Sequence, residues 1–203
     1  MLFRSHNKHE LENGVKKAFN NTSSDYILLE KYMECDDMFL NYTFRNGEII
    51  VSATGDRYTC RVPGDLGKVC IGAVYPSKYT ELYFKDLHPK MVSLFNDLGV
   101  KNGTLTISAF VEDSNIHLYD PGYRLQGEAQ NIHIEELCGY DQKTMLIEFA
   151  LGGSMGKVNL YDLIDYNFNG KHAATLWLLS KAGQIGSIEG LEEVSTKIGR
   201  AHV

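Results

Sequence analysis

The sequence predicts an α+β fold, in which antiparallel strands and separate helices pack together. Asn46-Gly47 lies between two stretches of alternating apolar residues, which is the strongest short signal of a β-hairpin. Residues 104–120 repeat that alternation around a polar turn and predict a second hairpin. Helical periodicity is confined to other segments, so strands and helices do not alternate as they do in a parallel, doubly wound sheet.

The first element is predicted to be a helix over residues 6–23. Asn7 can cap its start, Glu10 can complete a capping box, and apolar residues recur every fourth position along one side. Residues 26–33 follow with the composition of a buried strand. Proline and glycine punctuate residues 61–79, which predicts a stretch that is mostly loop.

The remaining elements follow from the same patterns. The hairpin around Asn46-Gly47 is expected over residues 38–58. A helix over residues 80–99 should break before Pro89, because a proline disfavours helical backbone in the residue ahead of it. Two helices come next, over residues 128–140 and 141–153. The tail, residues 171–194, is expected to form a helix followed by a short strand pair.

Composition argues against several classes of function. The 203 residues carry a net charge of -6 with a pI near 5.6, which argues against a nucleic-acid-binding surface. The longest apolar runs are too short to span a membrane, so we expect no membrane association. The four cysteines show no CxxC spacing, so neither a zinc site nor a redox pair is indicated, and a reducing, cytoplasmic location is expected. Self-association into a homo-oligomer stays open.

The end of the second hairpin brings polar side chains together. A three-residue turn at 113–115 would place Ser108 opposite Asp120, with Cβ atoms about 4.5–5.5 Å apart, so the two could share a metal ion or its water. Arg124 follows at strand spacing and can lean over the same face. This set suits Mg2+ and a phosphate, since oxygen ligands take the hard cation and the guanidinium takes phosphate oxygens. On residue types alone, a plain salt bridge between Asp120 and Arg124 remains the alternative.

The stretch Gly103–Arg124, GTLTISAFVEDSNIHLYDPGYR, resembles the last strands of the ATP-grasp fold. It is similar to the carbamoyl phosphate synthetase branch, and the two sequences match without a gap. In that family a Gln and a Glu hold the magnesium ions of ATP, while an Asn and an Arg hold phosphate and metal. The resemblance puts Ser108 and Asp120 at the two metal-binding positions and makes Arg124 the catalytic residue. Gly122 stands at the Asn position and cannot coordinate, which removes one ligand of the second metal site.

The segment YILLEKYMECDD resembles the adenine-binding hinge of ATP-grasp enzymes, a strand that ends in a glutamate before a short turn. The resemblance assigns Glu30 to the adenine amino group and Asp37 to the ribose hydroxyls. Lys31 and Met33 become the backbone partners of the base. ATP and Mg2+ are therefore the cofactors that the resemblance implies.

The activity that the resemblance implies is ATP-dependent ligation of a carboxylate substrate to an amine or a related nucleophile, through an acyl phosphate. Magnesium and Arg124 would spread charge over the γ-phosphate. Arg57, Arg61 and Lys78 are further candidates for binding phosphate or carboxylate from loops. Glu128 is expected on the substrate side.

Two alternatives stand beside the ligase. Ser108 and Gly122 would also fit a nucleotide-binding module without catalytic activity. The hinge segment and the second hairpin would equally suit a structural or partner-binding domain in which they no longer bind a nucleotide. ATP-dependent product formation separates the ligase from the inactive module, and nucleotide binding separates both from the structural domain.

The resemblance also divides the chain into three parts. Residues 1–33 are expected to end the small subdomain up to the hinge, residues 34–150 to form the C-terminal subdomain with the nucleotide and metal site, and residues 151–203 to be a C-terminal extension. In the family a glycine-rich loop and a phosphate-binding lysine precede the first helix. This chain begins at that helix, so we expect a C-terminal fragment that lacks the loop and is inactive alone.

Overall fold

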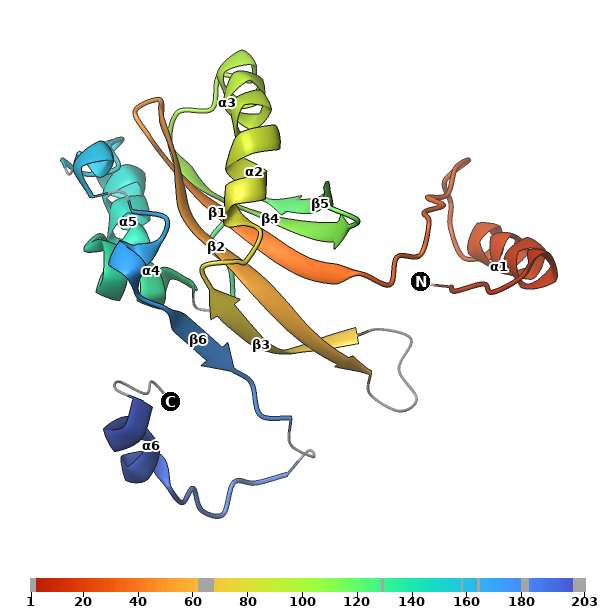
Figure 1. The fold of residues 1–203 in the computed structure, drawn as a ribbon. Helices are drawn as coiled ribbons and strands as arrows, with labels where there is room; N and C mark the ends of the chain where they lie inside the picture. The colour runs from red at the N-terminus through yellow and green to blue at the C-terminus, as the bar shows by residue number, and fades with distance from the viewer. Residues whose placement is uncertain are drawn as a thin grey trace.

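The computed structural model describes residues 3–61, 68–128, 130–157, 159–163, 165–179 and 183–198, and within them six antiparallel strands form one sheet in the order β5-β4-β1-β2-β3-β6 (Figure 1). The strands are β1 (Asp36–Arg45), β2 (Glu48–Arg61), β3 (Lys68–Tyr75), β4 (Gly103–Glu112), β5 (Asn115–Gly122) and β6 (Ala173–Leu176). The helices are α1 (Lys8–Asn20), α2 (Thr80–Asp86), α3 (His88–Asp97), α4 (Gln130–Cys138), α5 (Gln142–Gly152) and α6 (Leu191–Ile198), with short 3-10 helices at η1 (Leu160–Asp162) and η2 (Phe168–Gly170).

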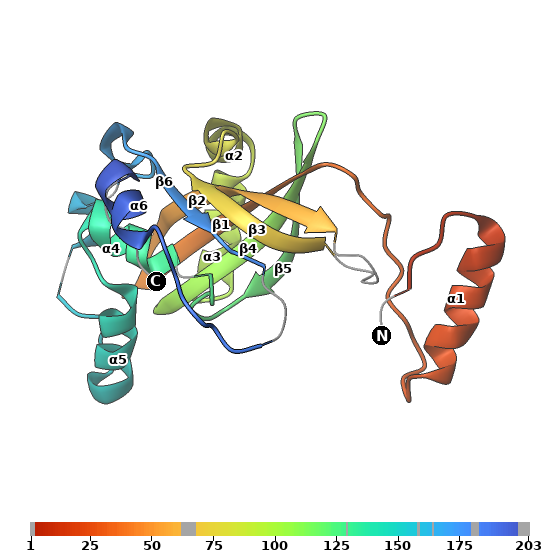
Figure 2. The same cartoon turned by 90° about the horizontal axis from the view of Figure 1, so that it is seen from below.

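Helices cover both faces of this sheet (Figures 1 and 2). On one face, α2 and α3 pack against Met38, Leu40 and Tyr42 of β1 in an apolar core. On the other face, α4 and α5 contribute Ile134 and Met145 to a second core. Because β1 lies between β2 and β4 and has helices on both sides, most of its residues are buried.

Two local predictions are confirmed. The hairpin of β1 and β2 turns at Asn46 and Gly47, whose φ angles of 51° and 92° are the backbone that a two-residue hairpin turn demands. The expected break before Pro89 is also present, since α2 ends at Asp86 and α3 begins at His88.

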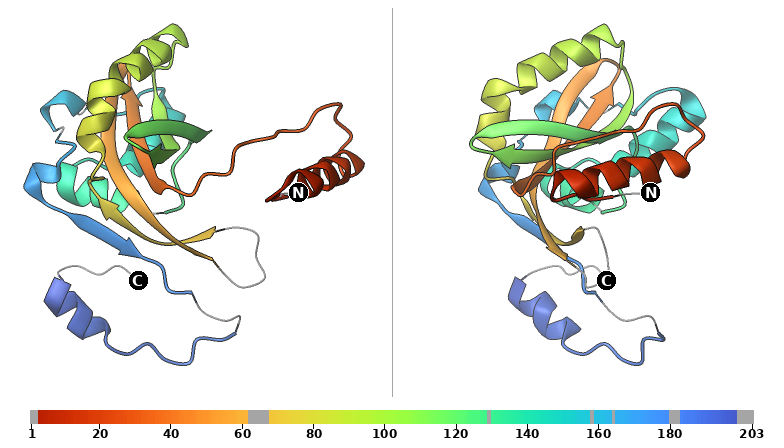
Figure 3. Two further views of the ribbon diagram at one scale, coloured as in Figure 1. Left: turned by 45° about the vertical axis from the view of Figure 1, so that its right-hand side comes forward. Right: turned by 90° about the vertical axis from the view of Figure 1, so that its right-hand side faces the viewer.

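The N-terminal segment agrees with the sequence prediction in its helix and departs from it in its strand. The Asn7 side chain accepts a hydrogen bond of 2.9 Å from the backbone N–H of Glu10 and caps α1 as expected. The strand predicted over residues 26–33 is wrong, because no described strand pairs with these residues and Leu28 is 81% exposed. A buried-strand composition produces a strand only where neighbouring strands pair with it. Helix α1 and this segment lie beyond the end of β1, apart from the sheet (Figure 3).

Two further predictions are corrected. Part of the loop predicted over residues 61–79 is strand β3, which pairs with β2 on one side and β6 on the other. In the tail, predicted as a helix and then a short strand pair, β6 comes first and α6 follows. Pairing decides this order, because Gly72–Tyr75 of β3 offers an open sheet edge to residues 173–176.

The predicted α+β class is confirmed, because every strand pairing is antiparallel and the helices lie in separate segments of the chain. Within the described ranges, every helix is too short or too polar to cross a bilayer.

Lowering the pH is expected to destabilise the fold through His88. Its ring nitrogen Nδ1 lies 3.1 Å from the Tyr42 hydroxyl at the start of α3, and burial lowers the pKa of His88. The unfolded chain then binds this proton more readily than the folded chain. The stabilising contribution is therefore present above the ordinary histidine pKa of about 6.5 and is lost as the pH falls through the folded-state pKa.

Urea unfolding of the wild type and of His88→Gln, at pH values on either side of that pKa, measures the effect. The other histidines are common to both proteins and cancel in the comparison. As the pH falls, we expect the unfolding free energy of the wild type to decrease relative to that of His88→Gln. A difference that does not change with pH would contradict this role of His88.

Candidate functional site

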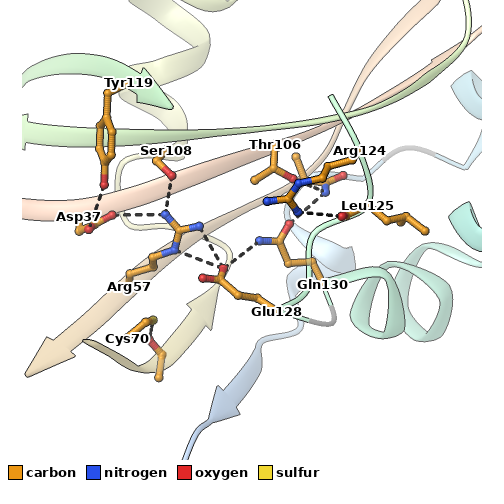
Figure 4. A network of polar contacts seen from close by, with 12 residues as sticks. Asp37, Arg57, Cys70, Thr106, Ser108, Tyr119, Arg124, Leu125, Glu128 and Gln130 are labelled. Atoms are coloured by element: carbon orange, nitrogen blue, oxygen red, sulfur yellow. Dashed lines mark hydrogen bonds and ion pairs between the residues drawn. The ribbon is translucent and has the colours of Figure 1, made fainter. Parts of the chain in front are cut away.

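Arg57 of β2 is the centre of a buried polar cluster on the sheet face that packs against α4 and α5 (Figure 4). It pairs with Asp37 of β1, and Phe39 pairs with Ser108 of β4, so alternate residues of three neighbouring strands meet on this face. Arg57 Nη1 donates a hydrogen bond of 2.8 Å to Ser108 Oγ and lies 3.6 Å from Asp37 Oδ1. Only 7% of the Arg57 side chain is exposed.

Glu128 closes the cluster from the loop that precedes α4. Its Oε2 accepts hydrogen bonds from Arg57 Nε at 3.3 Å and from Arg57 Nη2 at 3.0 Å. Gln130 Nε2 donates to the same oxygen at 3.4 Å, and Gln130 Oε1 accepts from Asn41 Nδ2 at 3.0 Å. Glu128 is therefore held by the guanidinium and by the first residue of α4, so the loop and the sheet fix one another.

An aromatic ring supports the guanidinium. Arg57 Cζ lies 4.9 Å from the centroid of the Phe39 ring, which is the arrangement of a cation–π contact. The ring in turn lies against the backbone of Gly55, its partner on β2, where a Cβ would come within 2.3 Å of the ring. The ring therefore requires a glycine at position 55.

Burial and ion pairing shift the pKa values of the cluster in different directions. Burial alone lowers the pKa of Arg57, but the carboxylates of Glu128 and Asp37 outweigh it, so that pKa is raised and the guanidinium stays charged. Burial raises the pKa of Asp37, and Arg57 offsets this only in part because the two groups approach no closer than 3.6 Å. Burial and the nearby Asp37 raise the pKa of Tyr119 to about 12, so its hydroxyl can donate to Asp37 Oδ2 across 3.4 Å.

A cavity of about 370 Å³ opens between this cluster and the segment that leads into β1. Aromatic and charged side chains line it together with Met33, among them Arg4, Tyr32, Asp36, Asp37, Arg57, Lys68, Lys78, Phe110 and Tyr119. Lys78 pairs with Asp36 at 2.7 Å, whereas Arg4 and Lys68 form no ion pair with a carboxylate among the residues described. The size and the mixed lining suit a small anionic ligand with an aromatic part.

The structure contradicts the predicted pairing of Ser108 with Asp120. The turn between β4 and β5 consists of Asp113 and Ser114 alone, both with positive φ, rather than of three residues. The shorter turn moves β5 by one position, so Tyr119 lies opposite Ser108. Asp120 is left at a β-bulge, exposed and with a φ of 46°.

Ser108 and Asp120 consequently do not fit a shared magnesium ion. They do not face each other, Ser108 Oγ already accepts a hydrogen bond from Arg57, and Gly122 offers no side chain. Mg2+ demands near-octahedral oxygen coordination at about 2.0–2.1 Å. Around Ser108 the Tyr119 hydroxyl donates to Asp37, and the carboxylates of Asp37 and Glu128 lie beside the Arg57 guanidinium. In the described part of the chain, no three His, Cys, Asp or Glu residues lie close enough to hold a metal ion. A contact between Asp120 alone and magnesium stays a prediction.

The residues predicted to bind the nucleoside differ in their surroundings. Met33 and Asp37 line the cavity. Glu30 and Lys31 are exposed, and Lys31 Nζ forms an ion pair with Glu112 at 3.0 Å. The roles of these four residues toward adenine and ribose stay predictions.

Of the predicted cations, only Arg57 belongs to the buried cluster, and it lies in strand β2 rather than in a loop. Arg61 forms an ion pair with Glu34 at 2.6 Å. Arg124 is exposed, and its Nη1 donates to the carbonyl oxygen of Leu125 at 3.1 Å. Figure 4 shows Arg124 apart from the Arg57 guanidinium, so the structure does not bring the predicted catalytic arginine into the cluster.

Sequence reasoning missed Phe39, Tyr119 and Gln130. Phe39 could have been found, because strand alternation places it on the same face as Asp37. Tyr119 would have followed from a two-residue turn after Glu112, which the polar residues there also permit. No local signal marks Gln130, since its role depends on where α4 meets the sheet.

Solved structures of other proteins share this fold. The L-amino acid ligase from Bacillus licheniformis matches with a TM-score of 0.66 over 97% of this chain and 48% of that chain, at 15% identity. Phosphoribosylglycinamide synthetase from Anaerococcus prevotii matches with 0.57 over 73% and 37%, at 14% identity. The biotin carboxylase domain of 2-oxoglutarate carboxylase from Hydrogenobacter thermophilus, in complex with MgADP, ADP and bicarbonate, matches with 0.57 over 76% and 34%, at 20% identity.

These neighbours are ATP-grasp ligases, and the likeness shows that the chain has the ATP-grasp fold, an antiparallel sheet with packed helices. No family model and no curated protein matches the sequence. The chain spans 48% of the L-amino acid ligase and a smaller share of the other two proteins.

Replacing Gly55 by alanine is expected to displace the Phe39 ring and, with it, Arg57. The added Cβ would lie 2.3 Å from the ring. Forcing an extra methyl group into a packed core typically costs about 1–3 kcal/mol, so urea denaturation should show a loss of unfolding free energy in that range.

Gly152→Ala is the matched control, because nothing lies within 4 Å of a Cβ at that position. It should leave the stability unchanged or raise it slightly. If Gly55→Ala proved as stable as the wild type, the ring would have room to move and would not be what fixes Arg57.

Proposed function

We propose that this chain carries the nucleotide site of an ATP-dependent ligase, which joins a carboxylate to an amine or a related nucleophile through an acyl phosphate. The observation that carries the proposal is the cavity beside Asp37 and Arg57, lined by aromatic rings and cations. Fold likeness to an L-amino acid ligase supports the reaction class, and a neighbour in complex with MgADP and bicarbonate supports ATP and Mg2+ as cofactors.

Different residues of the cavity are proposed to bind the ribose, the base and the phosphates of a nucleotide. Asp37 carries a half-buried carboxylate that can accept hydrogen bonds from ribose hydroxyls, and Met33 can offer backbone groups to the base. Tyr32 and Phe110 supply aromatic surface. Lys68 forms no ion pair with a carboxylate among the described residues, so it can bind phosphate oxygens without breaking such a pair first.

The proposed reaction needs no covalent nucleophile from the protein. The substrate carboxylate attacks the γ-phosphorus and ADP leaves, and the amine then attacks the acyl carbon and releases phosphate. Magnesium bound to the polyphosphate supplies charge neutralisation. The chain contributes positioning and fixed charge, which are the main catalytic effects in phosphoryl transfer.

Finer features belong to the same proposal. The motif Gly103–Arg124 supports a kinship to the carbamoyl phosphate synthetase branch. We propose residues 1–33, 34–150 and 151–203 as the hinge-bearing segment, the nucleotide-binding unit and the C-terminal extension. Arg124 is the proposed catalytic arginine, which would have to move toward the cavity from its exposed position.

One observation favours a second candidate, a nucleotide-binding module without catalytic activity. Ser108 Oγ, expected to hold magnesium, is hydrogen-bonded to Arg57, and Arg124, expected to act on the γ-phosphate, lies outside the buried cluster. Such a module would bind ATP in the same cavity and form no product.

Nucleotide binding is the first test, and we expect ATP to bind about tenfold more tightly than GTP. Guanine presents a carbonyl where adenine presents an amino donor, so Glu30 would face an acceptor. Glu30 is exposed in the free chain, and the cost reaches about 1–3 kcal/mol once the bound base buries this contact. Calorimetric titration with both nucleotides measures the ratio. Asp37→Asn should weaken ATP binding, whereas the exposed Asp86→Asn on α2, which lies outside the cavity, is the control. Equal affinities for ATP and GTP would argue against the hinge assignment.

Trapping of the acyl phosphate is the second test. The whole protein is incubated with ATP, Mg2+, hydroxylamine and a panel of carboxylates, and any acyl phosphate is captured as a hydroxamate. We expect hydroxamate with at least one carboxylate, together with an equal amount of ADP. ATP binding without hydroxamate or ADP for any carboxylate in the panel would favour the inactive module over the ligase.

A further inference from the structure

The guanidinium of Arg57 lies beside Ser108. The ATP-grasp resemblance places a magnesium ligand at the position of Ser108. Arg57 Nη1 donates a hydrogen bond of 2.8 Å to Ser108 Oγ, and Ser108 is only 6% exposed. A guanidinium is not deprotonated in proteins. The hydroxyl of Ser108 is therefore committed to a fixed positive charge.

The fold builds this position of the guanidinium from several elements. Glu128 Oε2 accepts from Nε and Nη2, at 3.3 and 3.0 Å. Asp37 lies at 3.6 Å, and the Phe39 ring lies 4.9 Å from Arg57 Cζ. These partners come from β1, β4 and the loop before α4. Moving Arg57 aside to admit an ion would break contacts with all three.

The other oxygens that a metal ion would need beside Ser108 are engaged, exposed or missing. The hydroxyl of Tyr119, which lies opposite Ser108, donates to Asp37 Oδ2. Asp120 is exposed at its bulge, and Gly122 has no side chain. Asp37 and Glu128 lie on opposite sides of the guanidinium, which fills the space between them (Figure 4). Two hydroxyls that are already hydrogen-bonded do not provide the octahedral oxygen shell that Mg2+ demands.

We propose that Arg57 takes the place of a protein-bound metal ion at Ser108 and is the resident cation against which a polyphosphate binds. This inference rests on the proposed nucleotide function of the cavity, which Arg57 lines. Arg57 Nη2 gives one N–H to Glu128 and has a second N–H with no partner among the described residues, so it can donate to a phosphate oxygen. A magnesium ion that arrives with the nucleotide is then held by phosphate oxygens and receives no ligand from Ser108.

Calorimetric titration of the chain with ATP and with inorganic tripolyphosphate, each in Mg2+ and in EDTA, tests the inference. Wild-type binding of tripolyphosphate should persist in EDTA, because the binding cation belongs to the chain. Arg57→Gln should weaken tripolyphosphate binding about tenfold or more, as expected for a lost charge-assisted hydrogen bond. Arg45→Gln is the matched control, since Arg45 is a largely buried arginine of the same hairpin that pairs with Glu48 and lies outside the cavity.

A metal-binding measurement covers the case in which Arg57→Gln does not fold. Electron paramagnetic resonance of Mn2+ in the presence of ADP reports the ion directly, in the wild type and in Ser108→Ala. We expect the two proteins to bind Mn2+ equally, because Ser108 supplies no ligand. A Mn2+ affinity about tenfold weaker in Ser108→Ala would overturn the inference.

The outcomes separate this inference from the proposed function. Tripolyphosphate binding that requires Mg2+, or no binding of tripolyphosphate, would overturn the role of Arg57. ATP binding that requires Mg2+ would also overturn it and would leave the nucleotide function standing. Metal-independent binding of tripolyphosphate that ATP does not displace would support Arg57 as the resident cation and count against the nucleotide function.

Discussion

The burial of one positive charge, on Arg57, is the constraint around which this face of the sheet is arranged. A buried guanidinium is tolerated only where carboxylates and other acceptors surround it, because its desolvation otherwise costs several kcal/mol. Those partners are Asp37 on β1, Ser108 on β4 and Glu128 in the loop before α4. The charge therefore couples the register of three strands to the position of that loop, and the cavity takes its shape from the same coupling.

Both faces of the sheet carry an apolar core, and the face under α4 and α5 adds a polar network to it. The face under α2 and α3 is an apolar core. The face under α4 and α5 carries a hydrogen-bonded chain in which Gln142 Nε2 donates to Asn41 Oδ1 at 2.8 Å and to Thr43 Oγ1 at 2.7 Å. Asn41 continues this chain through Gln130 to Glu128. Polar groups in a low-dielectric interior reinforce one another, so the packing of α4 and α5 helps to set the orientation of Glu128 beside the guanidinium.

The sequence predicts the elements of this fold better than the way they meet. The Asn46-Gly47 turn is a local signal, because its residues permit a backbone that few others adopt. The register of β4 and β5 depends instead on whether the polar run at 113–115 forms a turn of two or three residues, and packing against the α2–α3 face decides it. The composition of residues 26–33 suggests a strand, yet a strand needs a pairing partner that composition cannot supply. Arg57 and Ser108 were singled out from the sequence, but their contact is a product of register.

The residues proposed to meet the polyphosphate and those proposed to meet the base differ in how far the chain has organised them. Arg57 is buried and is held by the carboxylates of Asp37 and Glu128, so a polyphosphate would meet groups that are already in place. Glu30 and Lys31 are exposed, and the residues described provide no strand beside them, so a base would have to order this segment as it binds. Ordering of side chains and backbone is subtracted from the binding free energy, whereas a preorganised group incurs little of that cost. Under the proposed function, affinity for the polyphosphate and selectivity for the base would therefore depend on different parts of this chain and could be lost independently.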